Sequence, residues 1–389
     1  MLVVRKIMFG CLLLGVVCTL ICMRVLHLRE AVVIGRIVTV SSNSLRSEGV
    51  LTESGLTEMV KNPHQKPENA CPELQNIPNL ENDREMDLST TIEVNEVEHF
   101  VFDNRLQEIR DAVSTGHTLK KEGDIGGDNS SNHTLERLAS LGVQHGGYIY
   151  IPGGIYRPGK CRSRWRVAIV VPFRNRTAQL ATFLRYMVPF LQKQLLEFGI
   201  FVINQENDLL FNRGMLMNIG FLESQHFSNW DCYVFHDVDQ IPQSEFNPYE
   251  CINMPRHFVS GADNRNYSLP YSSYFGGVVG FKSAQFRLIN GLSNVYWGWC
   301  CEDDDLGQRL TTAQLRTNRY SGRTGHYKAI TKNHFRSSNH SAGESENREN
   351  LRKSRRRFKT DGLNSIRYSK PHIELHTLYT NISVDIRRL

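Results

Sequence analysis

Four acidic residues follow two tryptophans and two cysteines in the segment WGWCCEDDD, residues 297–305. Tryptophan rings stack on the apolar C–H faces of sugars, and carboxylates accept hydrogen bonds from sugar hydroxyls. A carboxylate that lies close to other acids also keeps a proton affinity suited to a general base. The segment therefore indicates a sugar site. The alternative is a solvated acidic turn behind a buried tryptophan.

A second acidic motif, HDVD at 236–239, comes directly after the apolar run CYVF. A strand that ends in Asp-x-Asp places carboxylates at the carboxyl edge of a sheet. One such carboxylate can hold a divalent ion that also grips a diphosphate. The alternative is an aspartate that only caps the next turn.

Three arginines stand where a nucleotide phosphate would bind. Arg174 and Arg176 follow the apolar run 167–171, and Arg213 begins a segment of helical spacing, where backbone N–H groups also favour anions. Any one of them alone is more commonly a surface residue. The prediction of a phosphate site depends on all three occurring at comparable places.

These motifs need a scaffold of alternating strands and helices. Apolar, β-branched runs predict buried strands at 167–171, 199–205 and 232–235, while 178–198 and 211–225 carry apolar residues at helical spacing. Strand, helix, strand, helix, strand predicts a parallel sheet with ligands at the carboxyl ends of its strands.

The chain of 389 residues is long enough for one large domain or two small ones, and its net charge of +6 is too mild to imply nucleic acid. The basic excess is concentrated at 352–359. We interpret it as a solvated basic face, with contact to an acidic glycan or a membrane surface as the alternative. An even number of cysteines beyond residue 24, six, together with several Asn-x-Ser/Thr sequons, fits a lumenal protein.

Residues 7–23 carry no charge, and basic residues flank them on both sides. We predict an uncleaved signal anchor, because no small-x-small cleavage site follows. Residues 1–6 would form a short cytoplasmic tail, 24–70 a flexible stem and 71–389 a lumenal catalytic domain. The polar stretch 110–135 predicts a loop, and we expect ordered structure to begin near residue 146.

The chain resembles the β-1,4-galactosyltransferase family, a group of Golgi type II membrane glycosyltransferases, at residue 71 and over 151–385. The matching stretches, in family order, are VAIVVPFRNR, FNRGMLMNIGF, VFHDVDQIP, YFGGV, WGWCCEDDD, DGLNSIRY and LYTNISVDI. The resemblance implies an α/β fold of the GT-A type with a mostly parallel central sheet. It also implies an insertion at about 85–140, because the chain is longer there than in typical members.

In function, the resemblance implies inverting transfer of galactose from UDP-galactose to the 4-hydroxyl of a terminal GlcNAc or related β-linked sugar. It implies Mn²⁺ as the metal, a glycan on protein or lipid as the acceptor, and a Golgi membrane location with the catalytic domain in the lumen. No nucleic acid is expected as a partner. A UDP-GalNAc transferase and a catalytically weak sugar-binding relative remain the alternatives.

Residue by residue, the resemblance implies that Asp303 is the general base and Glu302 its catalytic neighbour. The acceptor would contact Glu302, Asp303 and Asp304. The implied metal ligands are Asp239 and His334, and the implied disulfides are Cys71–Cys161 and Cys232–Cys251. The implied donor-binding residues are Pro172, Phe173, Arg174, Arg176, Phe211, Arg213, Asp237, Val238, Tyr274 and Trp299.

Three departures from the family pattern leave questions open. Cys300 and Cys301 stand where the family usually has two glycines, so acceptor fit and loop mobility are undetermined. Lys332 or Thr331, depending on the branch compared, stands where a further metal ligand is usual. Moreover HDVD resembles the xylose-specific branch, whereas DGLNSIRY resembles the branches that use GlcNAc.

Overall fold

A computed structural model describes residues 68–122, 136–330 and 343–388, all of which belong to one compact unit, Thr57–Leu389. The predicted cytoplasmic tail and signal anchor, and the stem up to residue 67, lie outside the described residues. Within the described ranges no helix has the length and apolar character that crossing a membrane requires.

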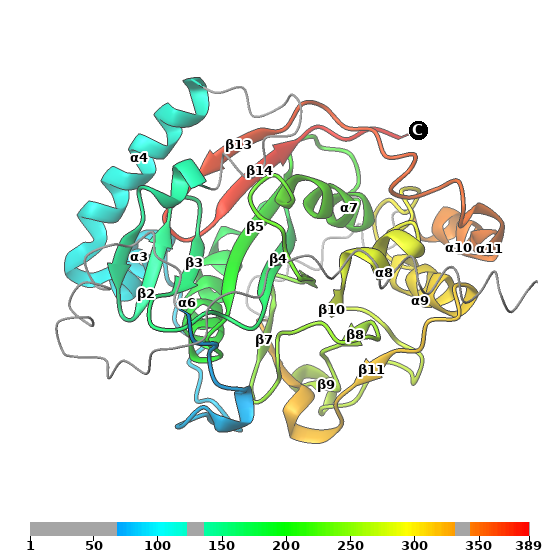
Figure 1. The fold of residues 1–389 in the computed structure, drawn as a ribbon. Helices are drawn as coiled ribbons and strands as arrows, with labels where there is room; N and C mark the ends of the chain where they lie inside the picture. Colours follow the sequence, from blue (N-terminus) through cyan, green and yellow to red (C-terminus); the bar gives the residue numbers. More distant parts are fainter. Residues whose placement is uncertain (1–67, 123–135, 331–342, 389) are drawn as a thin grey trace, which may run out of the picture. The chain divides into compact units, whose positions relative to one another are not determined.

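One sheet of eleven strands runs through this unit (Figure 1). Nine of its strands lie in the order β1 (Val143–His145), β2 (Tyr148–Ile151), β3 (Ile155–Pro158), β5 (Glu197–Gln205), β4 (Arg166–Phe173), β6 (Cys232–His236), β10 (Val278–Phe281), β8 (Arg256–His257) and β11 (Asn318–Arg319). The hairpin of β13 (His372–Leu375) and β14 (Thr380–Val384) joins the sheet through β5.

The centre of the sheet is parallel. β4 pairs in parallel with both β5 and β6, so that Ile169 lies opposite Ile200 on one side and Val234 on the other. Val167–Val171 are fully buried, as expected for a strand covered on both faces. The three predicted strands are thus confirmed. The flanking pairs β1–β2, β2–β3, β6–β10 and β10–β8 are antiparallel, which makes the sheet as a whole mixed.

Two helices cover opposite faces of this centre. α6 (Thr177–Lys193) packs with Val167, Ile169 and Val171, whereas α7 (Arg213–Ser224) packs with Ala168 and Val170. This division follows from the alternation of side chains along a strand. Sequence spacing predicted a helix up to residue 198, but α6 ends at Lys193, because Glu197–Gln205 forms strand β5.

The region around 85–140 contains helices where we expected a loop. α3 (Val94–Phe102) and α4 (Leu106–Glu122) precede the sheet. Leu106 and Ile109 are buried in the same cluster as Val97 and Phe102, so the apolar spacing of α4 decides its structure. The loop predicted for 110–135 is therefore wrong for 110–122, as is an ordered start near residue 146. Residues 123–135 lie outside the described residues.

The remaining elements are a second, smaller sheet, four further helices and four short 3₁₀ turns. A second sheet joins β7 (Gln240–Pro242), β12 (His326–Ala329) and β9 (Gly261–Ala262). The other helices are α8 (Ser283–Leu288), α9 (Glu302–Thr312), α10 (Glu344–Arg352) and α11 (Ser354–Arg357), and the short 3₁₀ turns are Leu74–Asn76, Asp103–Arg105, Asp263–Arg265 and Gly322–Gly325.

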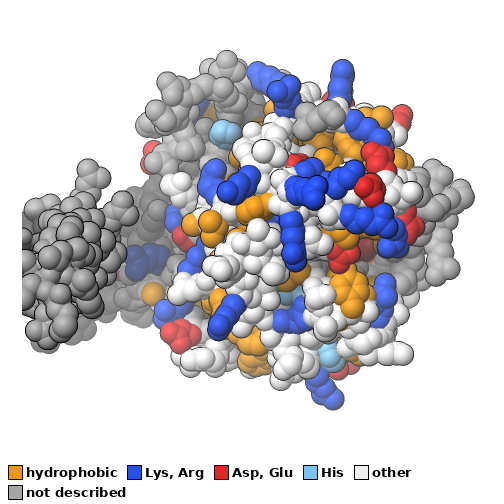
Figure 2. All heavy atoms as spheres, turned by 90° about the vertical axis from the view of Figure 1, so that its right-hand side faces the viewer, with side chains coloured by type: hydrophobic (Ala, Val, Ile, Leu, Met, Phe, Trp, Pro, Cys, Tyr) orange, Lys and Arg blue, Asp and Glu red, His pale blue; other side chains and the backbone are white. Residues whose placement is uncertain are grey.

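Basic side chains gather on the face toward α10 and α11 (Figure 2). The exposed ones in this stretch of sequence are Arg352, Lys353, Arg355, Arg356 and Lys359. Glu349 forms ion pairs with Arg352 and Lys353, which offsets part of this charge. Whether the face meets only solvent or an acidic surface stays a prediction.

Among the described residues, three disulfides are present. The implied bridges Cys71–Cys161 and Cys232–Cys251 are both present. A third joins the adjacent residues Cys300 and Cys301, a pairing that the resemblance did not imply.

Candidate functional site

A pocket of about 760 Å³ lies at the carboxyl ends of β4 and β6. The loop after β4, the loop after β6, the start of α7 and the start of α9 each contribute to its wall. Parallel strands end at one edge of a sheet, so motifs that are far apart in the sequence meet there. The lining residues that the sequence predicted are Pro172, Arg174, Arg176, Phe211, Arg213, Asp237, Val238, Asp239, Tyr274, Trp299, Glu302, Asp303 and Asp304.

Two predicted site residues are not found in this wall. Phe173 is partly buried and packs against the hydrophobic core on the α6 side, because side chains alternate along β4. His334 lies outside the described residues.

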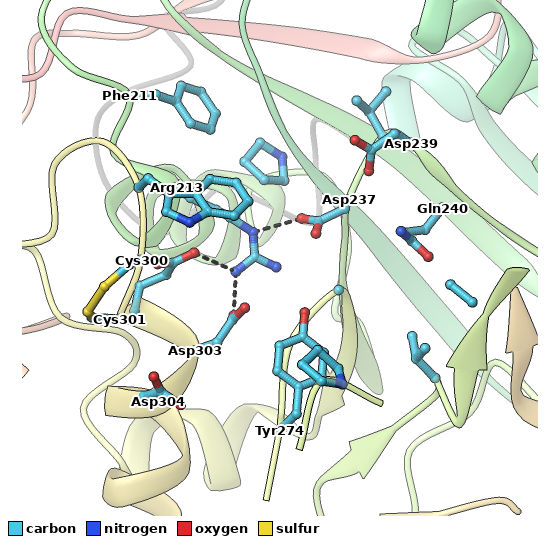
Figure 3. A pocket seen from close by; sticks show the side chains of 18 of the residues that line it. Phe211, Arg213, Asp237, Asp239, Gln240, Tyr274, Cys300, Cys301, Asp303 and Asp304 are labelled. Carbon is cyan, nitrogen blue, oxygen red and sulfur yellow. Dashed lines mark hydrogen bonds and ion pairs between the residues drawn. A yellow bond between two sulfur atoms is a disulfide. The ribbon is translucent and has the colours of Figure 1, made fainter. Parts of the chain in front are cut away.

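Arg213 lies at the centre of the site, between two acidic elements (Figure 3). Its Nε donates to Asp237 Oδ1 at 2.7 Å, and its Nη1 donates to Asp303 Oδ1 at 2.7 Å and lies 3.5 Å from Glu302 Oε1. Asn212 fixes its position by capping α7, since the Asn212 Oδ1 accepts a hydrogen bond from the Met215 N–H. Arg213 thereby joins the strand motif HDVD to the acidic segment of α9.

The second terminal nitrogen of Arg213, Nη2, is buried and meets no hydrogen-bond acceptor among the described residues. A buried guanidinium N–H without a partner costs free energy, about 1–3 kcal/mol. Such an atom in a pocket wall is therefore available to an oxygen of a bound ligand.

Two carboxylates of this cluster, Glu302 and Asp237, bind protons more tightly than usual. Burial raises the pKa of Glu302 to about 7, and the neighbouring Asp303 adds to the effect. Burial also raises the pKa of Asp237 to about 6, although Arg213 opposes the shift. Burial works against the charge of Arg213, but the three carboxylates outweigh it and raise the pKa of the guanidinium. Three carboxylates around one arginine carry an excess of negative charge that a further cation would balance.

Three of the four acids in α9 line the pocket, whereas the fourth, Asp305, supports the helix from inside the protein. All four acids lie in the first turn of the helix, where the helix dipole favours negative charge. Asp304 accepts a hydrogen bond from the Tyr271 hydroxyl. Asp305 is fully buried, pairs with Arg309 and accepts a hydrogen bond from the Tyr296 hydroxyl at 2.8 Å. The alternative of a solvated acidic turn is therefore wrong.

Tyr274 stands beside Asp303, and Gly276 makes room for this contact. A Cβ at Gly276 would lie 2.1 Å from Asp303 Oδ2 and 2.6 Å from the Tyr274 hydroxyl oxygen, so any side chain there would displace one of them. Burial, and next the charge of Asp303, raise the pKa of Tyr274 far above its usual value. Tyr274 therefore enters the pocket as a neutral hydroxyl.

Two residues that the sequence did not reveal hold this segment in place. Arg319 donates to the Tyr274 carbonyl and, from Nε, to His257 Nδ1 at 2.7 Å. His257 Nε2 then donates to the Gly276 carbonyl at 2.8 Å. Burial, with the charge of Arg319 next, lowers the pKa of His257 to about 3, so the imidazole is neutral and this tautomer is fixed. Neither residue belongs to a local motif, so no sequence signal pointed to them.

Asp239, the predicted metal ligand, is paired with Arg176 through a 2.9 Å hydrogen bond from Nη1 to Oδ2. Its backbone carbonyl accepts a hydrogen bond from the N–H of Ile330, the last described residue before 331. The described ranges contain no group of three or more His, Cys, Asp or Glu side chains suited to a metal ion. Asp239 supplies one hard oxygen donor, which suits a divalent ion.

Arg174 uses part of its hydrogen-bonding capacity on the scaffold. Its Nη1 donates to the carbonyls of Asn207 and Leu209, and its guanidinium lies over the ring of Phe211 at 5.5 Å. Of the three predicted phosphate arginines, Arg174 thus contacts carbonyls, Arg176 contacts Asp239, and Arg213 has an unpaired nitrogen in the described structure.

Sequence comparisons match two neighbouring family models. Residues 126–252 match the N-terminal region of glycosyl transferase group 7, and residues 256–334 match a model described as the N-terminal domain of galactosyltransferase. Together they cover just over half of the chain.

Among curated relatives, human β-1,4-galactosyltransferase 6 is 46% identical over 235 residues, which are 60% of this chain and 60% of that protein. The matched region thus spans about 60% of the length of this relative. Among solved structures, the catalytic domain of Drosophila β-1,4-galactosyltransferase 7 with xylobiose has a TM-score of 0.49 at 28% identity, covering 58% of this chain and 95% of that one. A mutant of the same Drosophila enzyme, solved with manganese, UDP-Gal and xylobiose, has a TM-score of 0.47 at 28% identity, with the same coverage.

Proposed function

Because the chain belongs to the β-1,4-galactosyltransferase family, we propose that it is an inverting transferase of the GT-A type that moves galactose from UDP-galactose to the 4-hydroxyl of a terminal GlcNAc or related β-linked sugar on a glycan. The observation that carries the proposal is the cluster in which Arg213 joins Asp237 to Asp303 within one pocket. This cluster brings a donor-side strand end and an acceptor-side helix start into direct contact.

On the donor side, Pro172, Arg174 and Phe211 line the same pocket as Asp237 and Asp239. The unpaired Nη2 of Arg213 provides a buried N–H for an oxygen of the donor. Positive groups in this position stabilise the charge that develops on the departing UDP. These contacts support a nucleotide-sugar donor.

On the acceptor side, Asp303 takes the proton of the acceptor 4-hydroxyl while that oxygen attacks C1 of galactose. The bond from C1 to the UDP oxygen breaks in the same displacement, so the configuration at C1 inverts without a covalent intermediate. Arg213 holds the Asp303 carboxylate in place. Glu302, whose pKa burial raises to about 7, is suited to a hydrogen bond with another acceptor hydroxyl.

We propose Mn²⁺ as the metal, held by Asp239 and His334. When bound, the ion neutralises charge on the diphosphate leaving group. The fit rests on the hard carboxylate of Asp239, on the surplus of acids around Arg213, and on the backbone contact of Asp239 with Ile330, four positions before His334. Asp239 would then exchange its partner Arg176 for the ion.

The cellular setting belongs to the same proposal. The uncharged segment 7–23 supports a single-pass type II anchor in the Golgi membrane, with the catalytic unit in the lumen. The disulfides of the described unit support an oxidising compartment.

The test is a panel of donors and acceptors with the full-length chain. UDP-galactose and UDP-GalNAc are each offered with β-linked GlcNAc, glucose and xylose acceptors, with Mn²⁺ or with EDTA. We expect galactose transfer that requires the metal and that Asp239→Asn largely abolishes. Preference for UDP-GalNAc would replace the donor assignment. UDP binding without transfer to any acceptor would make the chain a sugar-binding relative.

A further inference from the structure

The disulfide between Cys300 and Cys301 lies at the start of the helix that carries the acidic residues (Figure 3). Both cysteines have a left-handed backbone, with φ of 84° and 85°. Residues other than glycine, asparagine and aspartate rarely adopt this backbone conformation, because their Cβ crowds the following carbonyl oxygen. Two such residues in succession therefore need an additional constraint.

The backbone is anchored on both sides of this pair. On the N-terminal side, the Gly298 N–H donates to the Phe211 carbonyl at 2.8 Å, and Asn347 Nδ2 donates to the carbonyls of Trp297 and Trp299 at 3.0 and 2.9 Å. On the C-terminal side, the Cys301 carbonyl accepts the Asp305 N–H at 2.9 Å, which is the first bond of α9.

The two cysteines are thus the link between a clamped loop and a helix. Their backbone angles set the direction in which α9 leaves the loop. That direction decides whether Glu302 and Asp303 reach Arg213 and whether Asp304 reaches Tyr271. A bond between the two side chains closes a ring that contains the peptide between them, and the ring restricts both residues.

We propose that the Cys300–Cys301 disulfide is a positioning element of the acceptor site, which holds Glu302, Asp303 and Asp304 in their binding arrangement and releases them when it is reduced. This inference rests on the proposed function, because it takes these three carboxylates as the acceptor contacts. Donor contacts from β4 and β6 lie on other elements and are expected to persist.

Reduction requires a dithiol such as dithiothreitol. Its thiolate attacks the sulfur of Cys300, which is partly exposed, whereas Cys301 is 6% exposed. The bond between the two cysteine sulfurs breaks, Cys301 leaves as a thiolate and takes up a proton, and a mixed disulfide forms. The second thiol of the reagent then displaces Cys300. The protein gains two thiols, and the reagent becomes a cyclic disulfide.

Two double variants separate the sulfurs from the turn. Cys300→Ser/Cys301→Ser removes the bond but keeps side chains that resist a positive φ. Cys300→Gly/Cys301→Gly also removes the bond but permits this φ freely, so it is the matched control. We expect the serine variant to lose about tenfold or more in kcat/KM for the acceptor, mainly through KM, because small misplacements of binding groups are costly. The donor KM should stay within about twofold.

The glycine variant should retain most of the wild-type acceptor kcat/KM. Dithiothreitol should lower the acceptor kcat/KM of wild type to that of the serine variant, and it should not change the acceptor kcat/KM of the glycine variant. All three proteins share the bridges Cys71–Cys161 and Cys232–Cys251. The glycine variant in dithiothreitol therefore shows whether reduction of these two bridges affects activity. Mass spectrometry of the peptide with Cys300 and Cys301 verifies the redox state in each sample.

A serine variant with wild-type acceptor KM overturns the inference. A glycine variant as impaired as the serine variant overturns the claim that the disulfide acts by holding the left-handed backbone at residues 300 and 301, because glycine adopts that backbone without it. Hydrogen exchange of residues 297–305, without substrates, gives an independent reading. We expect faster exchange in the serine variant than in wild type.

If wild type transfers no sugar from any donor, the proposed function fails. The hydrogen-exchange comparison of residues 297–305 then still tests the positioning role of the disulfide. Equal exchange in wild type and the serine variant would then overturn it.

Discussion

At the scale of single residues, two neighbouring carboxylates share one arginine but have different surroundings. Asp303 accepts a 2.7 Å hydrogen bond from Arg213 and lies beside Tyr274, whereas Glu302 lies 3.5 Å from Arg213. The shorter contact orients the Asp303 carboxylate in the pocket. From this difference we propose Asp303 as the base and a binding role for Glu302.

Asp303→Asn should lower turnover with UDP-galactose by about 10²–10⁴-fold, since this is the usual effect of removing a general base. UDP binding, measured by calorimetry, should change little because the amide can still contact Arg213. Glu302→Gln serves as the control and should act mainly on acceptor KM. If UDP-galactose affinity collapses in Asp303→Asn instead, Asp303 contacts the donor and Glu302 becomes the better base.

Tyr274 should set the choice of donor sugar. We propose that it lies near C2 of the donor galactose, because its buried side chain lies beside Asp303 in the pocket wall. An N-acetyl group would overfill such a site at a cost of about 1–3 kcal/mol. Tyr274→Leu should therefore gain UDP-GalNAc use while it keeps much of its UDP-galactose activity.

Kinetics with both donors on wild type and on Tyr274→Leu decide this prediction, and Tyr271→Leu is a control in the same loop. A Tyr274→Leu variant that still rejects UDP-GalNAc would mean that Tyr274 only packs this loop.

Glu302 should also make stability depend on pH. Its pKa is raised from 4.5 to about 7 in the folded state, mainly by burial, so the folded protein keeps a proton that the unfolded chain has released. The folded state binds more protons between these values, and the free energy of unfolding therefore falls as pH rises from about 4.5 to about 7. One proton corresponds to about 1.4 kcal/mol per pH unit.

Glu302→Gln should remove this slope, so its stability relative to wild type should improve from pH 5 to pH 7.5. Urea unfolding at several pH values, in EDTA to exclude bound metal, measures the difference. Parallel curves for the two proteins across this range would contradict the pKa assigned to Glu302.

At the scale of elements, α9 carries both the site and its own support. Its first turn faces Arg213, while Asp305 and Arg309 behind that turn are buried as an ion pair, and Arg309 also donates to the Asp361 carbonyl at 2.7 Å. Asp305, the fourth acid of the run, therefore has a structural role as the buried partner of Arg309. The pair fixes α9 against the segment around Asp361. The first turn of α9 is thus held by Arg213 on one side and by Arg309 on the other.

Arg309→Met should lower the free energy of unfolding by about 3–5 kcal/mol, because Asp305 stays buried and loses its nearer charged partner, while Arg357 lies 3.8 Å away. The double variant Asp305→Asn/Arg309→Met should lose less, since no unpaired charge remains. Urea unfolding of the three proteins tests this. A double variant that is less stable than Arg309→Met would show that the contact of Asp305 with Tyr296 matters more than the ion pair.

At the scale of the whole molecule, the parts of the site that the sequence predicted are those attached to strong local patterns. β4, β5 and β6 are continuous apolar runs, and their carboxyl ends meet at one edge of the sheet, so the motifs after them come together by topology. α4 was missed because the polar residues beyond 110 hid the apolar positions Leu106 and Ile109 at its start.

The supporting contacts were beyond sequence reasoning for a different reason. His257 and Arg319 are 62 positions apart and meet only because β8 and β11 pair. The disulfide of Cys300 and Cys301 was not predicted either, since counting cysteines does not assign their partners. Local pattern thus located the reacting groups, and tertiary pairing determined what holds them.

The bridge Cys71–Cys161 connects the start of the described unit to the sheet. It closes a segment of 90 residues that contains α3, α4 and β1–β3. The Cys71 N–H donates to the Arg162 carbonyl at 2.8 Å, so a backbone contact reinforces the bond. Loop closure of this length restricts the unfolded chain strongly.

Cys71→Ala/Cys161→Ala should therefore lower the free energy of unfolding by about 2–5 kcal/mol, as measured with urea. Hydrogen exchange should increase first in α3 and α4, because the bridge ties the segment that contains them at both ends, while β4 in the centre of the sheet should stay protected. Cys232→Ala/Cys251→Ala is the control, since its bridge closes only 19 residues beside β6 and should leave α3 and α4 unchanged. Unaltered exchange in α3 and α4 of the first variant would mean that packing alone holds these helices in place, α3 on α6 and α4 on α3, β1 and β13.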